Sequence, residues 1–419
     1  MRVTLHPWSP GDLPILERSN TPEMTAYLNG PESGEEVRER HERYLRYRQT
    51  GEAHMFRIDV DGTPAGSIGW WQTRHKGVDA YETGWGVLPE WQGRGVAGRA
   101  LRQLIRRVAA EGDRDLLVAY PGTDNAASNA LCRRAGFEHT GSATAPWRGG
   151  HLAFHTWELD MSPLDLTDRT PDHQDDFDDG LDHTRWWPHY TPHWSSRAAT
   201  AARWETGESG LTLRIDADTA PWSPRYDGEV RVSHLQTGQF SGPVGSTIGQ
   251  HRFRDDLVVQ QAQRQRRLWL AHFGVLEVRL QAIRHPDAMV AFWPIGFEER
   301  PDESGEICVC EIFGNELDDT GGWVGVGVKP QHDPRLTLDF EKVRVEGDLT
   351  RFHDYAVEWD ADRLRFFIDG RWVKTVRQRI DYPVQFMLDV YELPGNSRRD
   401  AEAFPLRLRV RRVRSFPPR

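Results

Sequence analysis

The sequence predicts a multidomain protein in which an α/β domain is followed by an all-β sandwich. The chain has 419 residues, more than one hydrophobic core of ordinary domain size accommodates. Helical and strand periodicities alternate up to about residue 161, whereas helical periodicity nearly disappears beyond about residue 175. Between them, seven aspartates crowd residues 165–179. We therefore expect domains at residues 1–161 and 175–419, joined by an acidic, solvated linker at residues 162–174.

The composition excludes several classes of protein. The formal net charge is −10 and no basic stripe is concentrated anywhere, which argues against nucleic acid as the main partner. Three cysteines are too few for a disulfide scaffold and indicate a reducing compartment. The first residues form no apolar signal core, and no window approaches the length of a membrane span. We expect a cytoplasmic protein with no membrane partner.

The first domain begins with a hairpin pattern and continues with strands that lead into helices. The expected elements are strands at 55–60, 65–71, 81–88 and 116–120, a turn at Asp61-Gly62, and helices after the glycine-rich residues 89–98 and at 125–135. Ala97, Leu101, Leu104, Ile105 and Val108 fall on one face of the first helix. The sequence thus predicts a strand, a glycine-rich turn and a helix in direct succession.

Such a turn has a chemical use, because glycines let the backbone approach a pyrophosphate and the helix start supplies free amide groups. The run from Gln92 to Ala97 and the sequence Asn125-Ala-Ala-Ser128 resemble two signatures of the GNAT acetyltransferase superfamily, and the resemblance covers most of residues 1–160. It implies acetyl-CoA as co-substrate. The residues that it assigns to acetyl-CoA are Val87, Gln92, Gly93, Arg94, Gly95, Val96, Ala97 and Asn125.

Acetyl transfer to an amine needs a base for the amine and an acid for the departing thiolate. The resemblance implies that Glu82, on the strand before the turn, is the base. The candidate acid is Ser128, since residues 125–137 contain no tyrosine. The alternatives are a surface glutamate and a serine that only opens a helix.

The second domain is a series of short alternating strands. Leu276, Val278, Leu280 and Ala282 alternate with polar residues, and residues 355–359, 364–368 and 406–410 do the same, with a turn at Asp369-Gly370. Many such strands indicate an antiparallel sandwich. The last strand carries arginines at 407, 409 and 411, which predicts a solvated basic face.

Glu306 and Glu311 stand in an apolar run of β-forming residues from Gly305 to Gly314. Positions five apart point to opposite faces of a regular strand, and one β-bulge between them would bring both carboxyls to one face. Two converging carboxyls, one protonated and one ionised, are the minimum for retaining glycoside hydrolysis. The alternative is an ordinary strand whose glutamates reach solvent or an arginine.

This strand resembles the Glu-x-Asp-x-x-Glu strand of glycoside hydrolase family 16, with Glu306 as nucleophile, Glu311 as acid/base and Cys308 in place of the middle Asp. The resemblance covers residues 175–416 and implies a concanavalin-like jelly roll that acts on β-linked sugars. It rests further on residues 175–182, 273–279, 291–294, 352–359 and 366–370.

Tryptophans are the candidate sugar platforms, because aromatic rings stack on the apolar faces of pyranoses. Trp293 is the first choice by motif, followed by Trp323 and Trp187 and then by Trp186 and Trp194, each of which is otherwise a core residue. His332 and Glu392 are weaker candidates, with a solvated loop histidine and an outward glutamate as the alternatives. Cys308 and Cys310 have the spacing of a metal-binding pair, but no further Cys or His cluster accompanies them, so we expect buried thiols and no metal.

Together these features predict an acetyl-CoA-dependent N-acetyltransferase, with a small-molecule amine or aminosugar acceptor, fused to a retaining β-glycoside hydrolase or transglycosylase. Two alternatives stay open. The second domain is a sugar-binding module whose catalysis has lapsed with the loss of the Asp at position 308, or the two domains are unrelated activities, with an amine or a peptide N-terminus as acceptor.

Overall fold

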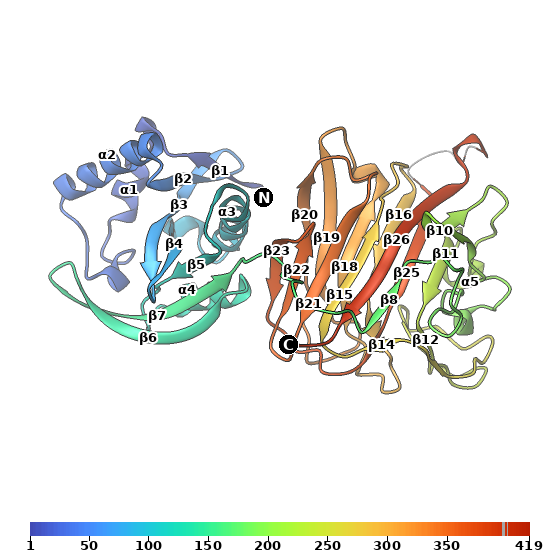
Figure 1. The fold of residues 1–419 in the computed structure, drawn as a ribbon. Coiled ribbons are helices and arrows are strands. Elements are labelled where there is room, and N and C mark those ends of the chain that lie inside the picture. Colours follow the sequence, from blue (N-terminus) through green and yellow to red (C-terminus); the bar gives the residue numbers. More distant parts are fainter. Residues whose placement is uncertain (396–398, 400) are drawn as a thin grey trace. The chain divides into compact units, whose positions relative to one another are not determined.

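The computed structural model describes residues 1–395, 399 and 401–419. The chain divides into two compact units, Met1–Pro163 and Leu164–Arg419. Each unit is described by itself (Figure 1). Among the described residues, no helix is long and apolar enough to cross a membrane.

The first unit is an α/β fold around one mixed sheet. Its elements are β1 Val3–Pro7, η1 Pro10–Asp12, α1 Leu13–Ser19, η2 Ala26–Leu28, α2 Gly34–Thr50, β2 Ala53–Val60, β3 Thr63–His75, β4 Val78–Val87, η3 Pro89–Trp91, α3 Val96–Glu111, β5 Leu116–Ala119, α4 Ala126–Arg134, β6 Glu138–Trp147 and β7 Gly150–Asp160. The strand order is β1-β2-β3-β4-β5-β7-β6, and the β4–β5 pairing is parallel. The strands and helices expected from the sequence are all present, with boundaries that differ by a few residues.

Local signals account for most of these boundaries. Ser33 and Glu36 form a capping box at the start of α2, and Asn125 caps α4 by accepting a hydrogen bond from the Ser128 amide. Along α3 the residues facing the sheet are Val96, Ala100, Leu101, Leu104, Ile105 and Val108, all buried. Ala97, expected on this face, is only half-buried, because the row passes through Ala100.

The second unit is an all-β sandwich. Its elements are β8 His173–Asp175, η4 Pro192–Trp194, β9 Arg203–Gly207, β10 Gly210–Ile215, α5 Pro224–Asp227, β11 Arg231–Gln236, β12 Gly238–Gln239, β13 Arg266–Arg267, β14 Leu270–Ala271, β15 Gly274–Leu280, β16 Ala288–Phe292, β17 Ile295–Gly296, β18 Glu306–Phe313, η5 Gly314–Glu316, β19 Gly321–Lys329, β20 Asp339–Glu346, β21 His353–Trp359, β22 Leu364–Ile368, β23 Arg371–Val376, β24 Val384–Gln385, β25 Met387–Glu392, η6 Ala401–Ala403 and β26 Leu406–Phe416. One sheet has the order β23-β22-β21-β15-β26-β10-β9, and the other runs β11-β25-β16-β18, with β19 and β20 beyond β18. Their facing side chains form one large core.

The segment at residues 162–174, expected as an acidic, solvated linker, lies along the second unit. The Leu164 amide donates to the Gly370 carbonyl, the Asp172 amide donates to the Ser415 carbonyl, and β8 pairs with β26. Its side chains are mostly exposed or half-buried, as the aspartates require. The contact boundary between the units therefore falls at Pro163, because backbone hydrogen bonds hold the acidic segment to the sandwich.

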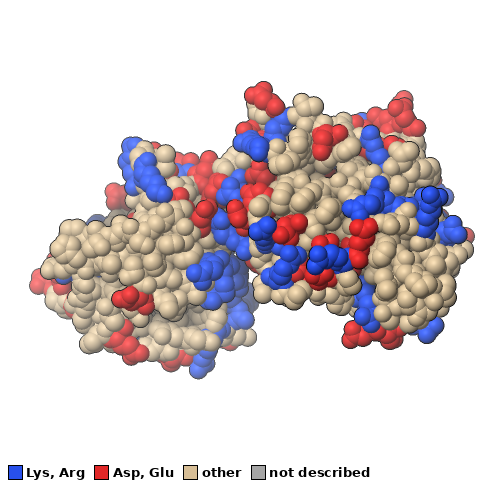
Figure 2. All heavy atoms as spheres, turned by 90° about the horizontal axis from the view of Figure 1, so that it is seen from below, with Lys and Arg blue, Asp and Glu red and all other residues tan. Residues whose placement is uncertain are grey.

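The last strand has the predicted alternation, with Leu406, Leu408 and Val410 buried. Farther along β26, Arg412 and Arg414 both pair with Glu277 of β15, at 3.1 and 2.7 Å. Figure 2 shows basic and acidic side chains interleaved on the face in view. The basic side of β26 is thus partly neutralised within its own sheet.

Candidate functional sites

The glycine-rich turn of the first unit lies between β4 and α3 and is exposed. Gly93 and Gly95 adopt φ values of 70° and 75°, a left-handed conformation that side chains with a Cβ rarely take. Gly95 is the N-cap of α3 and supplies no side-chain acceptor to the first amides of the helix. A Cβ on either glycine would meet nothing within 4 Å. The turn therefore offers open backbone and an uncapped helix start, which suits a pyrophosphate.

Other residues of the turn hold its shape. The Gln92 side-chain amide donates to the Val87 carbonyl at 2.8 Å, so the end of β4 is tied to the turn that follows it. The Arg94 guanidinium lies 5.5 Å from the Trp91 ring centroid, on the exposed side. Val96 is buried and anchors α3 against the sheet.

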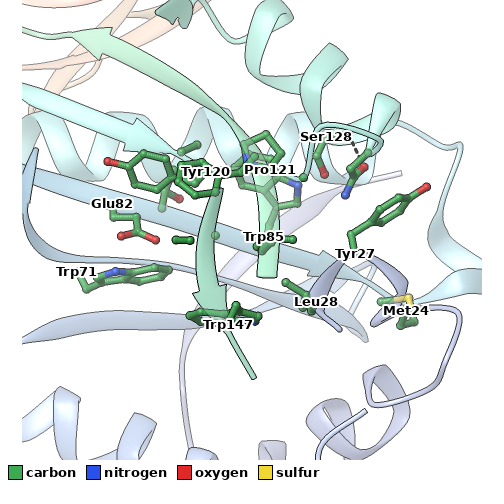
Figure 3. A pocket seen from close by; sticks show the side chains of 18 of the residues that line it. Met24, Tyr27, Leu28, Trp71, Glu82, Trp85, Tyr120, Pro121, Ser128 and Trp147 are labelled. Carbon is green, nitrogen blue, oxygen red and sulfur yellow. Dashed lines mark hydrogen bonds between the residues drawn. The ribbon is translucent and has the colours of Figure 1, made fainter. Parts of the chain in front are cut away.

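Beside the turn, β4 and β5 separate and leave a cavity of about 390 Å³ (Figure 3). The two strands pair only at Tyr81↔Leu117 and Glu82↔Val118. The residues that line the cavity beyond this point include Glu82 on β4 and both Asn125 and Ser128 at the start of α4. The structure thus brings together the proposed base, the proposed acid and one residue assigned to acetyl-CoA.

Glu82 is the one acidic residue lining the cavity among those described. Its carboxyl lies between Trp71 and Tyr120 (Figure 3). Burial raises the pKa of Glu82, and a hydrogen bond from the Trp71 indole, directly across the β3–β4 pairing, opposes this rise. A carboxylate with a raised pKa in a cavity is suited to accept a proton near neutral pH.

Tyr120, which the sequence analysis did not select, also lines the cavity. Its hydroxyl is 2.7 Å from His75 Nδ1, and His75 Nε2 is 2.8 Å from Glu158 Oε1. Burial and the charges of Glu82 and Glu158 raise the pKa of Tyr120 to about 12, so the phenol stays protonated and donates to His75. The only feature of the sequence that could have identified Tyr120 as a site residue is its position at the end of the strand that precedes Asn125.

Glu158 completes this chain of contacts. Burial opposes its ionisation, but hydrogen bonds from Lys76, Thr140 and His75 outweigh burial and lower its pKa to about 2. The Lys76 ammonium lies 2.6 Å from Glu158 Oε1 and is largely exposed. A chain of polar contacts therefore runs from the cavity through Tyr120, His75 and Glu158 to the surface.

In the second unit, β18 carries the two glutamates singled out by the sequence. The pairing of β18 with β19 shifts by one residue between Cys308 and Glu311, which is the bulge needed to bring Glu306 and Glu311 to one face. The Lys329 ammonium lies 3.0 Å from Glu306 Oε1 and 2.9 Å from Glu311 Oε2. One cation thus bridges both carboxylates.

Glu306 is more buried than Glu311, with 5% against 17% of its side chain exposed. Burial raises the pKa of Glu306, while Lys329 and a 2.6 Å hydrogen bond from the Gln331 amide act in the opposite direction. Burial would lower the pKa of Lys329, but the charges around it outweigh burial and raise it. Lys329 is therefore an ammonium ion at neutral pH.

Cys308 lies on the same strand between the two glutamates and is fully buried. Its thiol is 3.6 Å from the Gly325 carbonyl, and burial raises its pKa well above the ordinary value. The thiol is therefore protonated and gives neither glutamate a charged neighbour. Cys310 belongs to the sandwich core instead, since the bulge separates the two cysteines. Both are free, as is Cys132.

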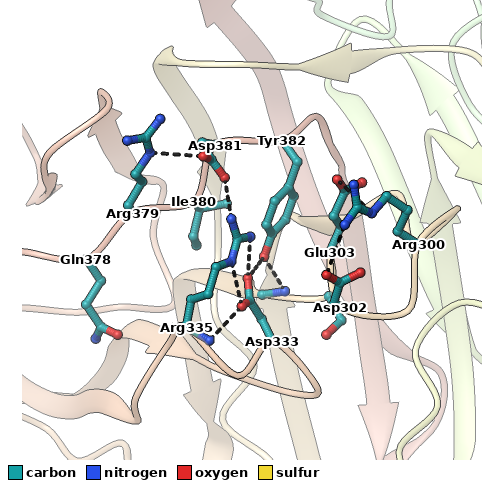
Figure 4. A network of polar contacts seen from close by, with 12 residues as sticks. Arg300, Asp302, Glu303, Asp333, Arg335, Gln378, Arg379, Ile380, Asp381 and Tyr382 are labelled. Carbon is teal, nitrogen blue, oxygen red and sulfur yellow. Dashed lines mark hydrogen bonds and ion pairs between the residues drawn. The ribbon is translucent and has the colours of Figure 1, made fainter.

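A polar network holds the start of β18 in place (Figure 4). The Gly305 amide donates to the Tyr382 hydroxyl at 2.7 Å, and that hydroxyl donates to Asp333 at 2.9 Å. Arg335 bridges Asp333 and Asp381. Because Gln331 lies two residues before Asp333, the network also fixes the loop that delivers the Gln331 amide to Glu306.

The three candidate sugar platforms have different environments. Trp293 is 6% exposed, and its indole donates at 2.7 Å to the buried carboxyl of Asp389, which also contacts His234 Nδ1 at 2.9 Å. Trp187 is half-buried beneath the Arg266 guanidinium, 4.0 Å from the ring centroid. Trp323 is 39% exposed. It precedes Gly325, the partner of Glu311, by two residues, so it lies on the face that carries the glutamates.

The weaker candidates also contact other residues of the second unit. Trp186 and Trp194 are fully buried and donate to Asp175 and to the Gln250 carbonyl. His332 Nε2 contacts the Arg252 carbonyl at 2.7 Å. Glu392, for which an outward position was the alternative, is 1% exposed and pairs with Arg399 and Arg231.

Comparisons with known proteins agree with both folds. Residues 2–138 match the family model described as acetyltransferase (GNAT) domain, and residues 266–396 match glycosyl hydrolases family 16. No curated protein sequence gives a match.

Among solved structures, the GlcNAc[α]1-4Gal releasing endo-[β]-galactosidase from Clostridium perfringens is 22% identical, with a TM-score of 0.53. The match covers 61% of this chain and 65% of that enzyme, so less than two thirds of the enzyme is spanned. The endo-beta-1,3(4)-glucanase SCLam matches at 17% identity over 62% of this chain and 95% of that one, with a TM-score of 0.45. RimL, titled a ribosomal L7/L12 alpha-N-protein acetyltransferase, matches at 23% identity over 38% of this chain and 90% of its own, with a TM-score of 0.33.

The two family models lead to one assignment for each unit. The chain carries a GNAT acetyltransferase domain followed by a domain of glycosyl hydrolases family 16.

Proposed function

We propose that the first unit transfers the acetyl group of acetyl-CoA to a primary amine. The observation that carries this proposal is the cavity in the separation of β4 and β5, which joins Glu82 to the start of α4 beside the glycine turn. When bound, acetyl-CoA supplies the acetyl thioester. The backbone at Gly93 and Gly95 and the uncapped start of α3 fit its pyrophosphate, and Val87, Gln92, Arg94, Val96, Ala97 and Asn125 are the further proposed contacts.

Glu82 takes a proton from the ammonium form of the acceptor, and the neutral amine attacks the acetyl carbonyl. The new C–N bond forms as the C–S bond breaks. The departing thiolate takes a proton from Ser128, which lines the same cavity, and Ser128 takes the second proton that the nitrogen must lose. Tyr120 stands next to Glu82 and leads through His75 and Glu158 toward the surface, a route by which the proton from the amine leaves the site.

Calorimetric titration with acetyl-CoA tests the binding step. In Gly95→Val the side chain enters the space where the pyrophosphate approaches, so binding should be lost. Gly51→Val is the matched control, because Gly51 has nearly the same backbone conformation, with φ of 74°, and lies in the open at the end of α2. Equal binding by both folded variants would show that the turn is not the site.

For the second unit we propose retaining cleavage of β-linked glycosides, with Glu306 as nucleophile and Glu311 as acid/base. One ammonium nitrogen lies 3.0 and 2.9 Å from the two carboxylates, so the contacting oxygens are no more than about 6 Å apart. That bound is compatible with the separation of about 5–5.5 Å between the carboxyl groups of retaining enzymes. Trp323 is the proposed exposed platform, with Trp293 and Trp187 as further sugar contacts.

A second candidate, a sugar-binding module without turnover, is favoured by one observation. Lys329 pairs with both carboxylates, and Cys308 supplies no charge to separate their pKa values. Assays of aryl β-glycosides and β-glucan oligosaccharides separate the two candidates. Turnover supports the hydrolase, whereas saturable binding of the oligosaccharides without turnover supports the module.

The cytoplasmic setting also stays a prediction. It is supported by three free cysteines and by the proposed use of acetyl-CoA. Fractionation of cells that express the protein checks it, and recovery outside the cytoplasmic fraction would contradict it.

A further inference from the structure

The lining of the cavity in the first unit carries information about the acceptor. Six aromatic rings surround it: Tyr27, Trp71, Trp85, Tyr120, Trp147 and Phe154. They come from η2, from β3 and β4, from the end of β5, and from the β6–β7 hairpin. Figure 3 shows Trp71 and Tyr120 on either side of the Glu82 carboxyl, with Trp85 and Trp147 farther along the cavity. Such a surface suits an apolar or planar ligand body.

The charge of the lining residues indicates which ligands the cavity favours. Glu82 is an acidic residue, and the lining residues that the structure describes include no Lys, Arg or His. An ammonium group placed beside Glu82 would gain an ion pair and would lie near the faces of aromatic rings, where cations are attracted. A carboxylate or phosphate on the ligand would meet Glu82 without a compensating cation. The cavity therefore favours cationic over anionic ligands.

Three polar groups that line the cavity already have partners within the protein. The Thr83 hydroxyl donates to the Gly69 carbonyl, the Asn125 carbonyl oxygen accepts from the Ser128 amide, and the Tyr120 hydroxyl is bound to His75. A sugar ring or a peptide backbone brings several polar groups that lose water on entry, and each needs a partner. Other hydroxyl groups line the cavity too, but its surface is mostly apolar, so a sugar ring or a peptide backbone would lose more contacts with water than it regains. The lining therefore disfavours an aminosugar and a peptide N-terminus as acceptors.

We infer that the acceptor is a small arylalkylamine, a primary amine on a short chain attached to an aromatic ring. Its ammonium pairs with Glu82 between Trp71 and Tyr120, and its ring lies against the aromatic residues toward Trp147. This inference rests on the proposed acetyl transfer and names the substrate class of that site. The ammonium nitrogen loses one proton to Glu82 and a second, by way of Ser128, to the CoA thiolate as it gains the acetyl group, so the product is a neutral amide that no longer pairs with the carboxylate.

An acceptor panel tests the inference on the full chain. Phenethylamine, glucosamine and a tetrapeptide with a free N-terminus are each incubated with acetyl-CoA, and release of the CoA thiol is measured. We expect kcat/KM for phenethylamine to exceed the other two by at least about tenfold. Preference for glucosamine or the peptide would overturn the inference and leave acetyl transfer intact. Failure to bind acetyl-CoA at all would overturn the proposed function and the inference with it.

If acetyl-CoA binds but no acceptor is turned over, calorimetry tests whether the site binds an arylalkylamine. Phenethylamine is titrated into the protein saturated with CoA, with 2-phenylethanol and phenylacetate as neutral and anionic probes of the same shape. We expect the amine to bind at least about tenfold more tightly than either probe, and Glu82→Gln to abolish its advantage over the alcohol. Absence of amine binding, or an advantage that survives Glu82→Gln, would overturn the inference.

A separate variant tests the contact between the aromatic ring of the ligand and Trp147. Trp147 is 46% exposed, so Trp147→Ala leaves the core intact, and we expect about 3- to 30-fold weaker binding of phenethylamine. Val78→Ala is the control, since Val78 is 53% exposed at the far end of β4 and does not line the cavity. Unchanged binding in folded Trp147→Ala would contradict the placement of the ring.

Discussion

Glu82 in the first unit and the Glu306–Glu311 pair in the second are carboxylates on strands, yet within the described part of the chain only the pair in the second unit has a cation in contact with it. Glu82 lies among aromatic rings, and burial raises its pKa. Burial raises the pKa of Glu306 too, but Lys329 contacts both Glu306 and Glu311 and acts against the rise at Glu306. The comparison teaches that a carboxylate at the expected position is not sufficient evidence of catalysis, because a neighbouring cation opposes the uptake of a proton.

The largest effect is expected for Glu82→Gln. Removal of a positioned base lowers the rate of acetyl transfer by about 10²- to 10⁴-fold, while acetyl-CoA binding is retained. Because burial raises the pKa of Glu82, the acidic limb of kcat/KM in the wild type should lie above the pH of an ordinary glutamate, and activity should fall as pH drops through it. Rate measurements across pH check both points. Full activity in Glu82→Gln would mean that the base lies elsewhere.

The second prediction separates the roles of the two glutamates in the sandwich. On an aryl β-glycoside with an activated leaving group, Glu306→Gln should reduce turnover by at least about 10²-fold, whereas Glu311→Gln should spare much of it. The two variants serve as controls for each other, since both remove one partner of Lys329. Turnover that persists in Glu306→Gln would contradict its assignment as nucleophile.

Replacement of Lys329 tests how the shared cation affects the two glutamates. Lys329→Met leaves two carboxylates close together, so one should take up a proton and become able to act as an acid. We expect hydrolysis of β-glucan oligosaccharides to rise by about tenfold, with little change on activated aryl glycosides.

Two further variants control this result. Lys342→Met removes another lysine near the glutamates, one that pairs with Glu316 instead. Cys308→Asp should raise hydrolysis by the separate route of restoring a charged neighbour. If neither Lys329→Met nor Cys308→Asp has turnover on any glycoside, the binding module becomes the better account.

The smallest effect is expected for Tyr120→Phe, which keeps the ring in the cavity and removes the contact with His75. Acetyl transfer should fall by less than about tenfold if the chain to Glu158 only helps the proton to leave. Tyr81→Phe is the matched control, because the Tyr81 hydroxyl donates to Asp113 outside the cavity. A solvent isotope effect that is unchanged in Tyr120→Phe would argue against a role in proton transfer.

Much of both folds followed from local sequence patterns. The glycine turn before α3, the Asn125 cap of α4 and the alternation of β15 and β26 depend on residues close along the chain. Turn conformation, capping and period-two burial are set by local chemistry, so the sequence states them directly. The bulge in β18 could also be predicted from the sequence, because two glutamates five residues apart reach one face of a strand only if one extra residue lies between them.

What the tertiary structure decided is which distant residues surround each carboxylate. Pairing of β18 with β19 places Lys329 between Glu306 and Glu311, and the order β3-β4-β5-β7 brings His75 and Glu158 to Tyr120. It also placed Trp293 in a buried pair with Asp389 and held residues 162–174 to the second unit. Neighbours across a sheet are set by strand order and register, which depend on how the whole core packs and not on the residues adjacent in sequence.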